Sequence, residues 1–255
     1  MIRRDEKDSW ILIRQHDHAK LSYQIMEFWG NNLFSALKPK DEVLFAIKEH
    51  DCGWIEWDSN PKVNILNGYP MNFMEMNTND QYGIWSRSFL KHSSRHPYAS
   101  ALIALHFAKF NQKTIDKNPD NQVAIAYRHE FQKFVARMLK INNGNFNSIK
   151  IPIDAKINLR MVQAGDLISL ALCHGWSSTE ISDVPLDYNG KSTNIKITSP
   201  DRLCFQISPF PFDKDEISFK IKGMRLTGKK FKNNQEFKKE LDSENFENIE
   251  FNIMK

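Results

Sequence analysis

The adjacent residues His50-Asp51 are the part of this sequence that most clearly indicates chemistry. Three distant residues share one unusual property with them. His18, His106 and Asp166 each lie on or beside the apolar stripe of a stretch with helical spacing. A lone imidazole or carboxylate is costly to bury in apolar surroundings without a partner. We therefore expect these five side chains to share one buried site.

The chemistry expected of such a site is metal binding, because imidazole and carboxylate groups suit divalent iron, manganese, cobalt, zinc or magnesium. We expect His18, His50, Asp51 and Asp166 to be primary ligands, and His106 to be the added ligand of a second ion. Open coordination positions would accept water or substrate. Asp51 and His106 are the expected catalytic residues. The alternative for each buried group is a hydrogen bond to a neighbour within the core.

Helices must position these ligands, and the apolar spacing predicts six of them. They are expected over residues 17–29, 39–50, 81–92, 97–110, 121–140 and 157–173. The His-Asp pair stands at the end of the second helix, where Gly53 is the expected stop. Pro97 is expected at the first position of the fourth. Metal-type residues at a helix end are well placed to face a cleft.

The segments outside these helices are predicted to form loops, turns and strands. Residues 58–80 are rich in Asn, Pro, Gly and Asp, which predicts a long irregular loop that could form a lid. Residues 142–148 are turn-forming. Beyond about residue 180, short β-prone runs at 193–198, 202–208 and 217–226 predict a small antiparallel sheet. We thus expect a helical domain over residues 1–180 and a small β-rich region over 181–255 packed on it.

The order His18, His50-Asp51, Asp166 on successive helices resembles the HD-domain superfamily, a helical fold of metal-dependent proteins. The runs Gln15-His16-Asp17-His18-Ala19, His50-Asp51-Cys52-Gly53-Trp54 and Asp166-Leu167-Ile168-Ser169-Leu170 more closely resemble an uncharacterised bacterial family catalogued only as a domain of unknown function. That resemblance covers most of the chain, including the Pro209–Phe212 region. The fold class expected from the superfamily resemblance and the predicted elements is mainly α, an HD-domain-like bundle with a small antiparallel β region at the C-terminus.

The superfamily resemblance implies metal-dependent hydrolysis of phosphoesters. Three basic residues near the segment from His92 to His96 could then receive a phosphate, and they are Arg87, Lys91 and Arg95. A branch of the superfamily, the mixed-valent di-iron oxygenases, has two more histidines between the His-Asp pair and the last Asp. His106 fits one of these positions, and His92 or His96 could fit the other.

Two remaining histidines are given lesser roles. His16 alternates with His18 across the start of its helix and should face another direction, so it is at most an outer partner of the site. His174 stands at a helix end, where a favourable contact with the helix dipole accounts for it without a site.

Composition limits the partners. The net charge of +4 comes from 35 basic and 31 acidic residues interleaved along the 255-residue chain, which argues against a dedicated nucleic-acid or membrane surface. The apolar run Trp10–Ile13, which follows a charged N-terminus, is too short for a signal sequence or a membrane span. Three cysteines, an odd number, indicate no disulfide framework and favour a reducing cytoplasm. A small-molecule substrate is the expected partner, and the sequence does not indicate an oligomeric state.

These observations predict a metal-dependent hydrolase acting on a phosphoester-type small molecule, with one or two divalent ions. One alternative is a mixed-valent di-iron oxygenase of a small polar substrate. The other is a non-catalytic protein that binds or senses a small molecule.

Overall fold

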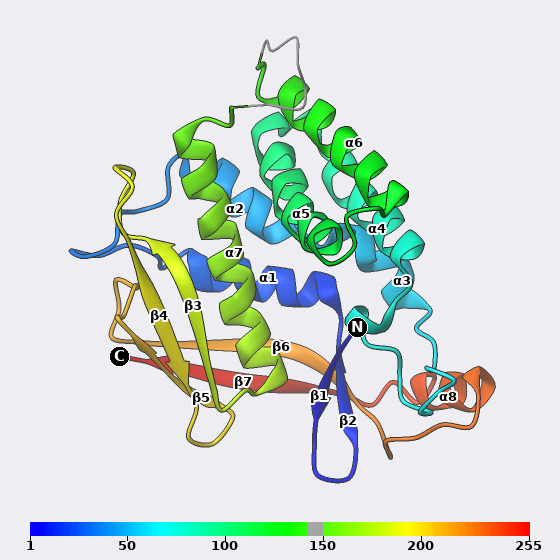
Figure 1. The fold of residues 1–255 in the computed structure, drawn as a ribbon. Coiled ribbons are helices and arrows are strands. Elements are labelled where there is room, and N and C mark those ends of the chain that lie inside the picture. Colours follow the sequence, from blue (N-terminus) through cyan, green and yellow to red (C-terminus); the bar gives the residue numbers. More distant parts are fainter. Residues whose placement is uncertain (142–149) are drawn as a thin grey trace.

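The computed structural model describes residues 1–141 and 150–255, so the expected turn at 142–148 lies outside the described residues. A layer of helices lies against a curled sheet (Figure 1). The helices of the described chain are α1 (Gln15–Met26), α2 (Lys40–Glu49), α3 (Ile55–Ser59), α4 (Thr78–Leu90), α5 (Pro97–Lys117), α6 (Gln122–Met138), α7 (Ile153–His174) and α8 (Asn234–Leu241), with short 3-10 turns at Cys52–Trp54 and Phe73–Glu75.

The sheet has seven strands in the order β1-β2-β6-β7-β5-β4-β3. Their bounds are β1 (Ile2–Asp5), β2 (Trp10–Ile13), β3 (Ser178–Pro185), β4 (Ser192–Thr198), β5 (Cys204–Ser208), β6 (Glu216–Arg225) and β7 (Phe246–Met254). Neighbouring strands are antiparallel except for the parallel pair β5 and β7. Two-residue alternation explains the central strands: in β6, Ile217, Phe219 and Ile221 are buried, and the residues between them face solvent.

The predicted mainly α fold, a helical bundle with a small antiparallel β region, is wrong. The strands expected at 193–198, 202–208 and 217–226 are present, but they belong to a larger sheet that also takes β1 and β2 from the N-terminus. Composition conceals β1, because Arg4 occupies an inward position and is buried. Its guanidinium is satisfied by donating to the backbone carbonyls of Leu172 and Arg202. The proposed division at residue 180 stays a prediction.

The six expected helices are all present as α1, α2, α4, α5, α6 and α7, with bounds shifted by a few residues. Pro97 begins α5 as expected. The segment 58–80 is less irregular than expected, because α3 already covers its first residues. Further on, Val63 pairs with Pro70 in an isolated bridge, and a capping box closes between Asn72 and Glu75.

Two helices, α1 and α7, connect the layers. α1 packs on β6, and α7 packs on β1 and β3, while both also contact α2. The two helices approach each other closely at Gly165, where a Cβ atom would lie 2.7 Å from Cγ of Met26 and 2.9 Å from Oγ of Ser22. Glycine at this point lets α7 lie directly against α1 beside His18 and Asp166. Within the described residues, no helix is both long enough and apolar enough to cross a membrane.

Candidate metal centre

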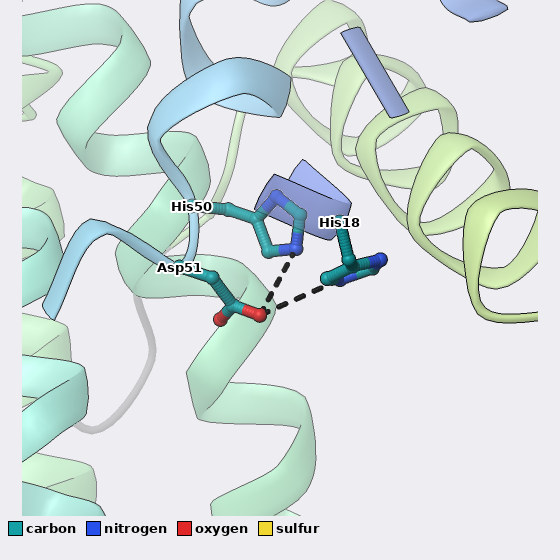
Figure 2. Close-up of side chains that lie close together, drawn as sticks. All are labelled: His18, His50 and Asp51. Carbon is teal, nitrogen blue, oxygen red and sulfur yellow. Dashed lines mark ion pairs between the residues drawn. The ribbon is translucent and has the colours of Figure 1, made fainter. Parts of the chain in front are cut away.

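The structure brings together all five residues expected to form a site. His18 comes from α1, His50 and Asp51 from the turn that ends α2, His106 from α5 and Asp166 from α7, and every one of them is buried. Figure 2 shows the imidazoles of His18 and His50 directed at the carboxylate of Asp51. Residues from four elements separated by up to 148 positions in the sequence thus meet at one point in the helical layer.

The turn after α2 separates the two adjacent ligands in direction. His50 caps the helix with helical dihedrals, whereas Asp51 has φ −106° and ψ 19°, so the chain leaves the helix between them. Gly53 then lies against α4, where a Cβ atom would stand 2.1 Å from the carbonyl oxygen of Ile84. Its backbone N–H donates to Oγ of Ser88 at 3.0 Å. The glycine is therefore required for the turn to approach α4, rather than as a helix stop alone.

Hydrogen bonds at the far side of each ring determine which nitrogen of His50 and His18 faces the site. Nδ1–H of His50 donates to the carbonyl of Ile47 at 2.7 Å, because a carbonyl can only accept. Oγ of Ser169 donates to the carbonyl of Asp166 at 3.0 Å, so it accepts from Nδ1–H of His18 at 2.6 Å. In the neutral form, both rings then present an unprotonated Nε2 to the site.

These two nitrogen atoms face carboxylate oxygens. Nε2 of His18 lies 3.5 Å from Oδ2 of Asp51 and 3.2 Å from Oδ1 of Asp166. Nε2 of His50 lies 3.6 Å and 3.5 Å from the same two oxygens. Both nitrogen atoms are buried, and neither has a hydrogen-bond partner within residues 1–141 and 150–255. Lone pairs of nitrogen and oxygen facing one another repel unless a positive charge lies among them.

The shifted pKa values of the imidazoles and of Asp166 also indicate that a positive charge is favoured at this site. Burial alone lowers the pKa of His50, but the carboxylates of Asp51 and Asp166 outweigh it and raise the pKa to about 9. The pKa of His18 is raised by the same balance of burial against these two carboxylates. Burial would raise the pKa of Asp166, yet the neighbouring imidazoles hold it well below its usual range. Either protons on the imidazoles or a bound cation can supply this charge.

His106 stands on the other side of Asp166. Its Nε2 lies 3.7 Å from Oδ2 of Asp166, whereas Oδ1 of that carboxylate faces His18 and His50. The ring of His106 packs edge-on against that of His50, with centroids 5.4 Å apart. Burial lowers the pKa of His106 to about 4. The two oxygens of one carboxylate therefore face different imidazoles, the arrangement that a single ion or a bridged pair of ions could use.

A cavity of about 440 Å³ opens from this cluster. His18, Asp51, His106 and Asp166 form part of its wall, and most of the remaining wall is apolar. Its other residues are Gln15, Trp54, Phe73, Met74, Gln81, Trp85, Phe107, Phe110, Thr114, Leu167, Leu170, His174 and Trp176. The cluster is thus buried but reachable by a small molecule, which is typical of a binding or catalytic site.

Other residues considered from the sequence lie elsewhere. His92 contacts Glu49 at 3.2 Å, and His96 contacts Glu42 at 2.9 Å, so both have their own carboxylate partners outside the five-residue cluster. Arg87 and Lys91 line a separate cavity on the far side of the turn at Gly53. The structure does not bring these basic groups to the cavity beside the cluster.

Three further residues that line the cavity were not predicted to belong to the site. His174 lines the cavity with an otherwise buried Nε2, and Gln15 and Trp176 also face it. The sequence carries a weak signal for His174 only: Gly175 takes the left-handed conformation with φ +66°, which ends α7 beside the cavity. For Gln15 and Trp176 no local pattern indicated the position.

The comparisons with known proteins give a family without an activity. Neither the curated proteins nor the solved structures that were compared with the chain yielded a match. A family model does match, and it covers residues 1–228, including all five residues of the cluster. The chain belongs to the family described as "Protein of unknown function (DUF3891)".

Proposed function

We propose that the chain is a metal-dependent hydrolase of small molecules, with His18, His50, Asp51 and Asp166 holding a divalent ion. One observation carries the proposal: the Nε2 atoms of His18 and His50 are turned toward two carboxylates by hydrogen bonds at Nδ1, and have no hydrogen-bond partner of their own in the described chain. A fixed tautomer, an outer hydrogen bond and an unshared nitrogen are the properties of histidine ligands to metals.

The donor set limits the ion. Two or three imidazoles and two carboxylates suit iron, manganese, cobalt or zinc, and magnesium less well, because nitrogen donors favour the later metals. The order of ligands along the chain, His18, then His50-Asp51, then Asp166, supports a centre of the HD type. His106 provides for a second ion at the free oxygen of Asp166.

The hydrolytic chemistry follows from this arrangement. A divalent ion here would supply a Lewis acid and lower the pKa of a coordinated water to roughly 7. His18, His50, Asp51 and Asp166 would position that ion at the inner end of the cavity, and the apolar wall would exclude bulk water from the reacting bond. His106 stands next to the same carboxylate, where its imidazole would accept a proton from the attacking water when no second ion is bound.

An oxygenase with two irons is the second candidate. The observation that favours it is the division of Asp166, whose two oxygens face His18 with His50 on one side and His106 on the other. Against it, neither His92 nor His96 is near the cluster, so the second ion would have few protein ligands.

The test begins with metal analysis of protein purified without chelator, comparing the native chain with His50→Ala and His92→Ala. We expect at least one equivalent of metal in the native chain and in His92→Ala, and loss in His50→Ala. The metal-loaded protein is then assayed with manganese or cobalt on carboxylic and phosphoric esters, and examined by electron paramagnetic resonance for a mixed-valent di-iron signal.

Each outcome assigns a class. Ester hydrolysis that is lost with His50→Ala supports the hydrolase, and the di-iron signal without hydrolysis supports the oxygenase. Bound metal with neither property indicates a binding protein. Substoichiometric metal that His50→Ala does not change would reject the metal centre altogether.

A further inference from the structure

Aromatic side chains are the largest group in the wall of the cavity beside the metal centre. Six of its residues carry aromatic carbocyclic or indole rings, and they are Trp54, Phe73, Trp85, Phe107, Phe110 and Trp176. Among the wall residues that the structure describes, none is lysine or arginine, and the carboxylates are those of Asp51 and Asp166 in the metal centre. A ligand that carries charge beyond the metal would meet no ionic partner on this wall, and burying such a charge is costly.

The rings form two continuous rows. In the first row, Trp54 contacts Phe73 with centroids 6.3 Å apart, and Phe73 lies 6.4 Å from the ring of His174. His174 in turn stacks on Trp176 at 5.1 Å with planes only 5° apart. This row therefore presents ring faces and edges from the 3-10 turn at Cys52–Trp54 to the end of α7.

The second row begins at the metal centre itself. Phe110 packs edge-on against His106 at 4.9 Å and lies 6.2 Å from Trp85. Trp85 stacks on Phe107 at 5.4 Å with planes 13° apart. Because aromatic rings favour offset-stacked and edge-to-face contacts, a wall of this kind selects a planar ring over a saturated one of the same size.

The rim of the cavity is also apolar. Met74, Phe110 and Trp176 all line it, yet they are 64%, 38% and 37% exposed. Exposed apolar side chains that cluster at the edge of a cavity mark a place where a ligand is covered. Phe110 and Trp176 come from different rows, so a ligand between them would contact both.

Two polar atoms in this wall lack partners. Oε1 of Gln15 is buried with no hydrogen-bond partner among residues 1–141 and 150–255, and the residue is 2% exposed. Nε2 of His174 is likewise buried and without a partner in the described chain. A buried acceptor left alone is costly, so a ligand that donates a hydrogen bond to it gains affinity. The amide oxygen of Gln15 can only accept, which requires an O–H or N–H group on the ligand.

We propose that this cavity binds a small molecule with a planar aromatic ring that is uncharged apart from any group at the metal, and that donates a hydrogen bond to Oε1 of Gln15. The ring lies against the two aromatic rows, and His174 offers a second hydrogen bond. As the substrate class of the proposed hydrolase, this corresponds to an ester whose aromatic ring also carries a free hydroxyl or amino group, which is the donor to Oε1 of Gln15. That assignment of a reacting group rests on the proposed function, whereas ring binding does not.

The experiment measures binding by calorimetry with three matched probes: 2-naphthol, decahydro-2-naphthol, which lacks the aromatic ring, and 2-methoxynaphthalene, which lacks the donor. We expect 2-naphthol to bind about tenfold more tightly than decahydro-2-naphthol, through contacts with the rows. It should also bind about tenfold more tightly than 2-methoxynaphthalene, through one hydrogen bond to a buried acceptor.

Two phenylalanines provide a matched pair of variants. Phe110 lies on the cavity rim, is 38% exposed and is covered by the ammonium group of Lys113. Phe246 lies on β7, away from the cavity, is 40% exposed and is covered in the same way by Lys222. Phe110→Ala should weaken 2-naphthol binding about fivefold to tenfold, and Phe246→Ala should leave it unchanged. Gln15→Met keeps the side-chain length but removes the acceptor, so it should abolish the preference for 2-naphthol over 2-methoxynaphthalene. Circular dichroism checks that each variant is folded.

The two proposals can fail separately. Equal binding of 2-naphthol and decahydro-2-naphthol, or affinity unaffected by Phe110→Ala, would overturn the aromatic ligand and leave the metal analysis untouched. Selective binding of 2-naphthol that depends on Phe110 and Gln15, in protein that takes up no metal, would support the ligand class and reject the hydrolase.

Discussion

Two groups of metal-type residues lie on either side of the turn that follows α2. The proposed site, which we call the metal centre, comprises His18, His50, Asp51, His106 and Asp166. The outer cluster comprises Glu49, Cys52 and His92, whose ligand atoms also lie within 4.8 Å of one another. Glu49 and Cys52 flank the His-Asp pair in sequence, so the turn directs the two middle side chains to one group and the two flanking side chains to the other.

The groups differ in how their donor atoms are satisfied. In the outer cluster, Nε2 of His92 contacts Oε2 of Glu49 at 3.2 Å, and the thiol of Cys52 donates to the carbonyl of Ser88 at 3.6 Å. Burial raises the pKa of Cys52 to about 12, so without a cation the thiol keeps its proton and can donate this hydrogen bond. In the metal centre, by contrast, Nε2 of His18 and His50 have no partner within the described residues. Proximity of ligand types is therefore a weaker indication of a site than donor atoms that the protein leaves unshared.

The largest difference in metal affinity is expected when one carboxylate of each group is neutralised in turn. Asp166→Asn deprives three imidazoles of a facing carboxylate, and we expect metal affinity to fall by more than about 100-fold, beyond what loss of an outer partner causes. Glu49→Gln, the same change in the outer cluster, should alter affinity less than about twofold. Competitive titration with a fluorescent metal indicator measures both. Equal losses would remove the distinction between the groups.

A methyl group at the shared turn should disturb the whole arrangement. In Gly53→Ala the new Cβ would lie 2.1 Å from the carbonyl oxygen of Ile84, so the turn must move away from α4. We expect the free energy of unfolding to fall by about 3 kcal/mol, the upper end for overpacking. Gly228→Ala is the control, because nothing lies within 4 Å of its added Cβ. Urea denaturation measures both, and an unchanged Gly53→Ala midpoint would contradict the close approach.

Removing the hydrogen bond at Nδ1 of His18 should have an intermediate effect on metal affinity. Ser169→Ala removes the acceptor that orients Nδ1–H of His18, and we expect a loss of 10- to 100-fold in metal affinity. Ser100→Ala is a matched change of a fully buried serine whose hydroxyl has no partner in the part of the chain that the structure describes. Its metal affinity should be unchanged. If calorimetric metal titration gives the same affinity for both variants, Ser169 does not orient a ligand.

The smallest effects are expected from the outer cluster itself. His92→Ala removes a contact with Glu49 that is partly exposed, and the free energy of unfolding should fall by less than about 1 kcal/mol. Metal content should remain that of the native chain. Elemental analysis together with thermal unfolding checks both statements. Loss of metal in this variant would place the ion in the outer cluster and reverse the comparison.

The sequence was most informative about helices and their buried polar residues. Apolar spacing located α1, α5 and α7, and it showed that His18, His106 and Asp166 lie on stripes that a core would cover. A polar residue on an apolar helical stripe is visible in the sequence, and burying it without a partner is costly. These residues could therefore be identified without the structure. Their convergence in space was an inference from that shared cost, and the geometry places them together.

The sheet and the cavity were not predictable in the same way. β1 has a buried arginine at an inward position, and its acceptors lie about 170 to 200 residues away on α7 and before β5. Such a partner cannot be seen in a local pattern, and neither can the pairing of β2 with β6. Gln15, His174 and Trp176 meet only because α1 and α7 end at the same cavity. Contacts between residues far apart in the sequence determine the sheet pairing and the cavity wall. The residue spacing within one segment does not indicate such contacts.

The central claim is tested most directly by the anomalous difference map of a crystal grown with zinc. We predict a peak among the five residues of the metal centre, with Nε2 of His18 and of His50 at about 2.0–2.1 Å and an oxygen of Asp51 and of Asp166 at about 2.0–2.2 Å. A peak held by Glu49, Cys52 and His92, or full density for both histidines with no peak between them, would contradict it.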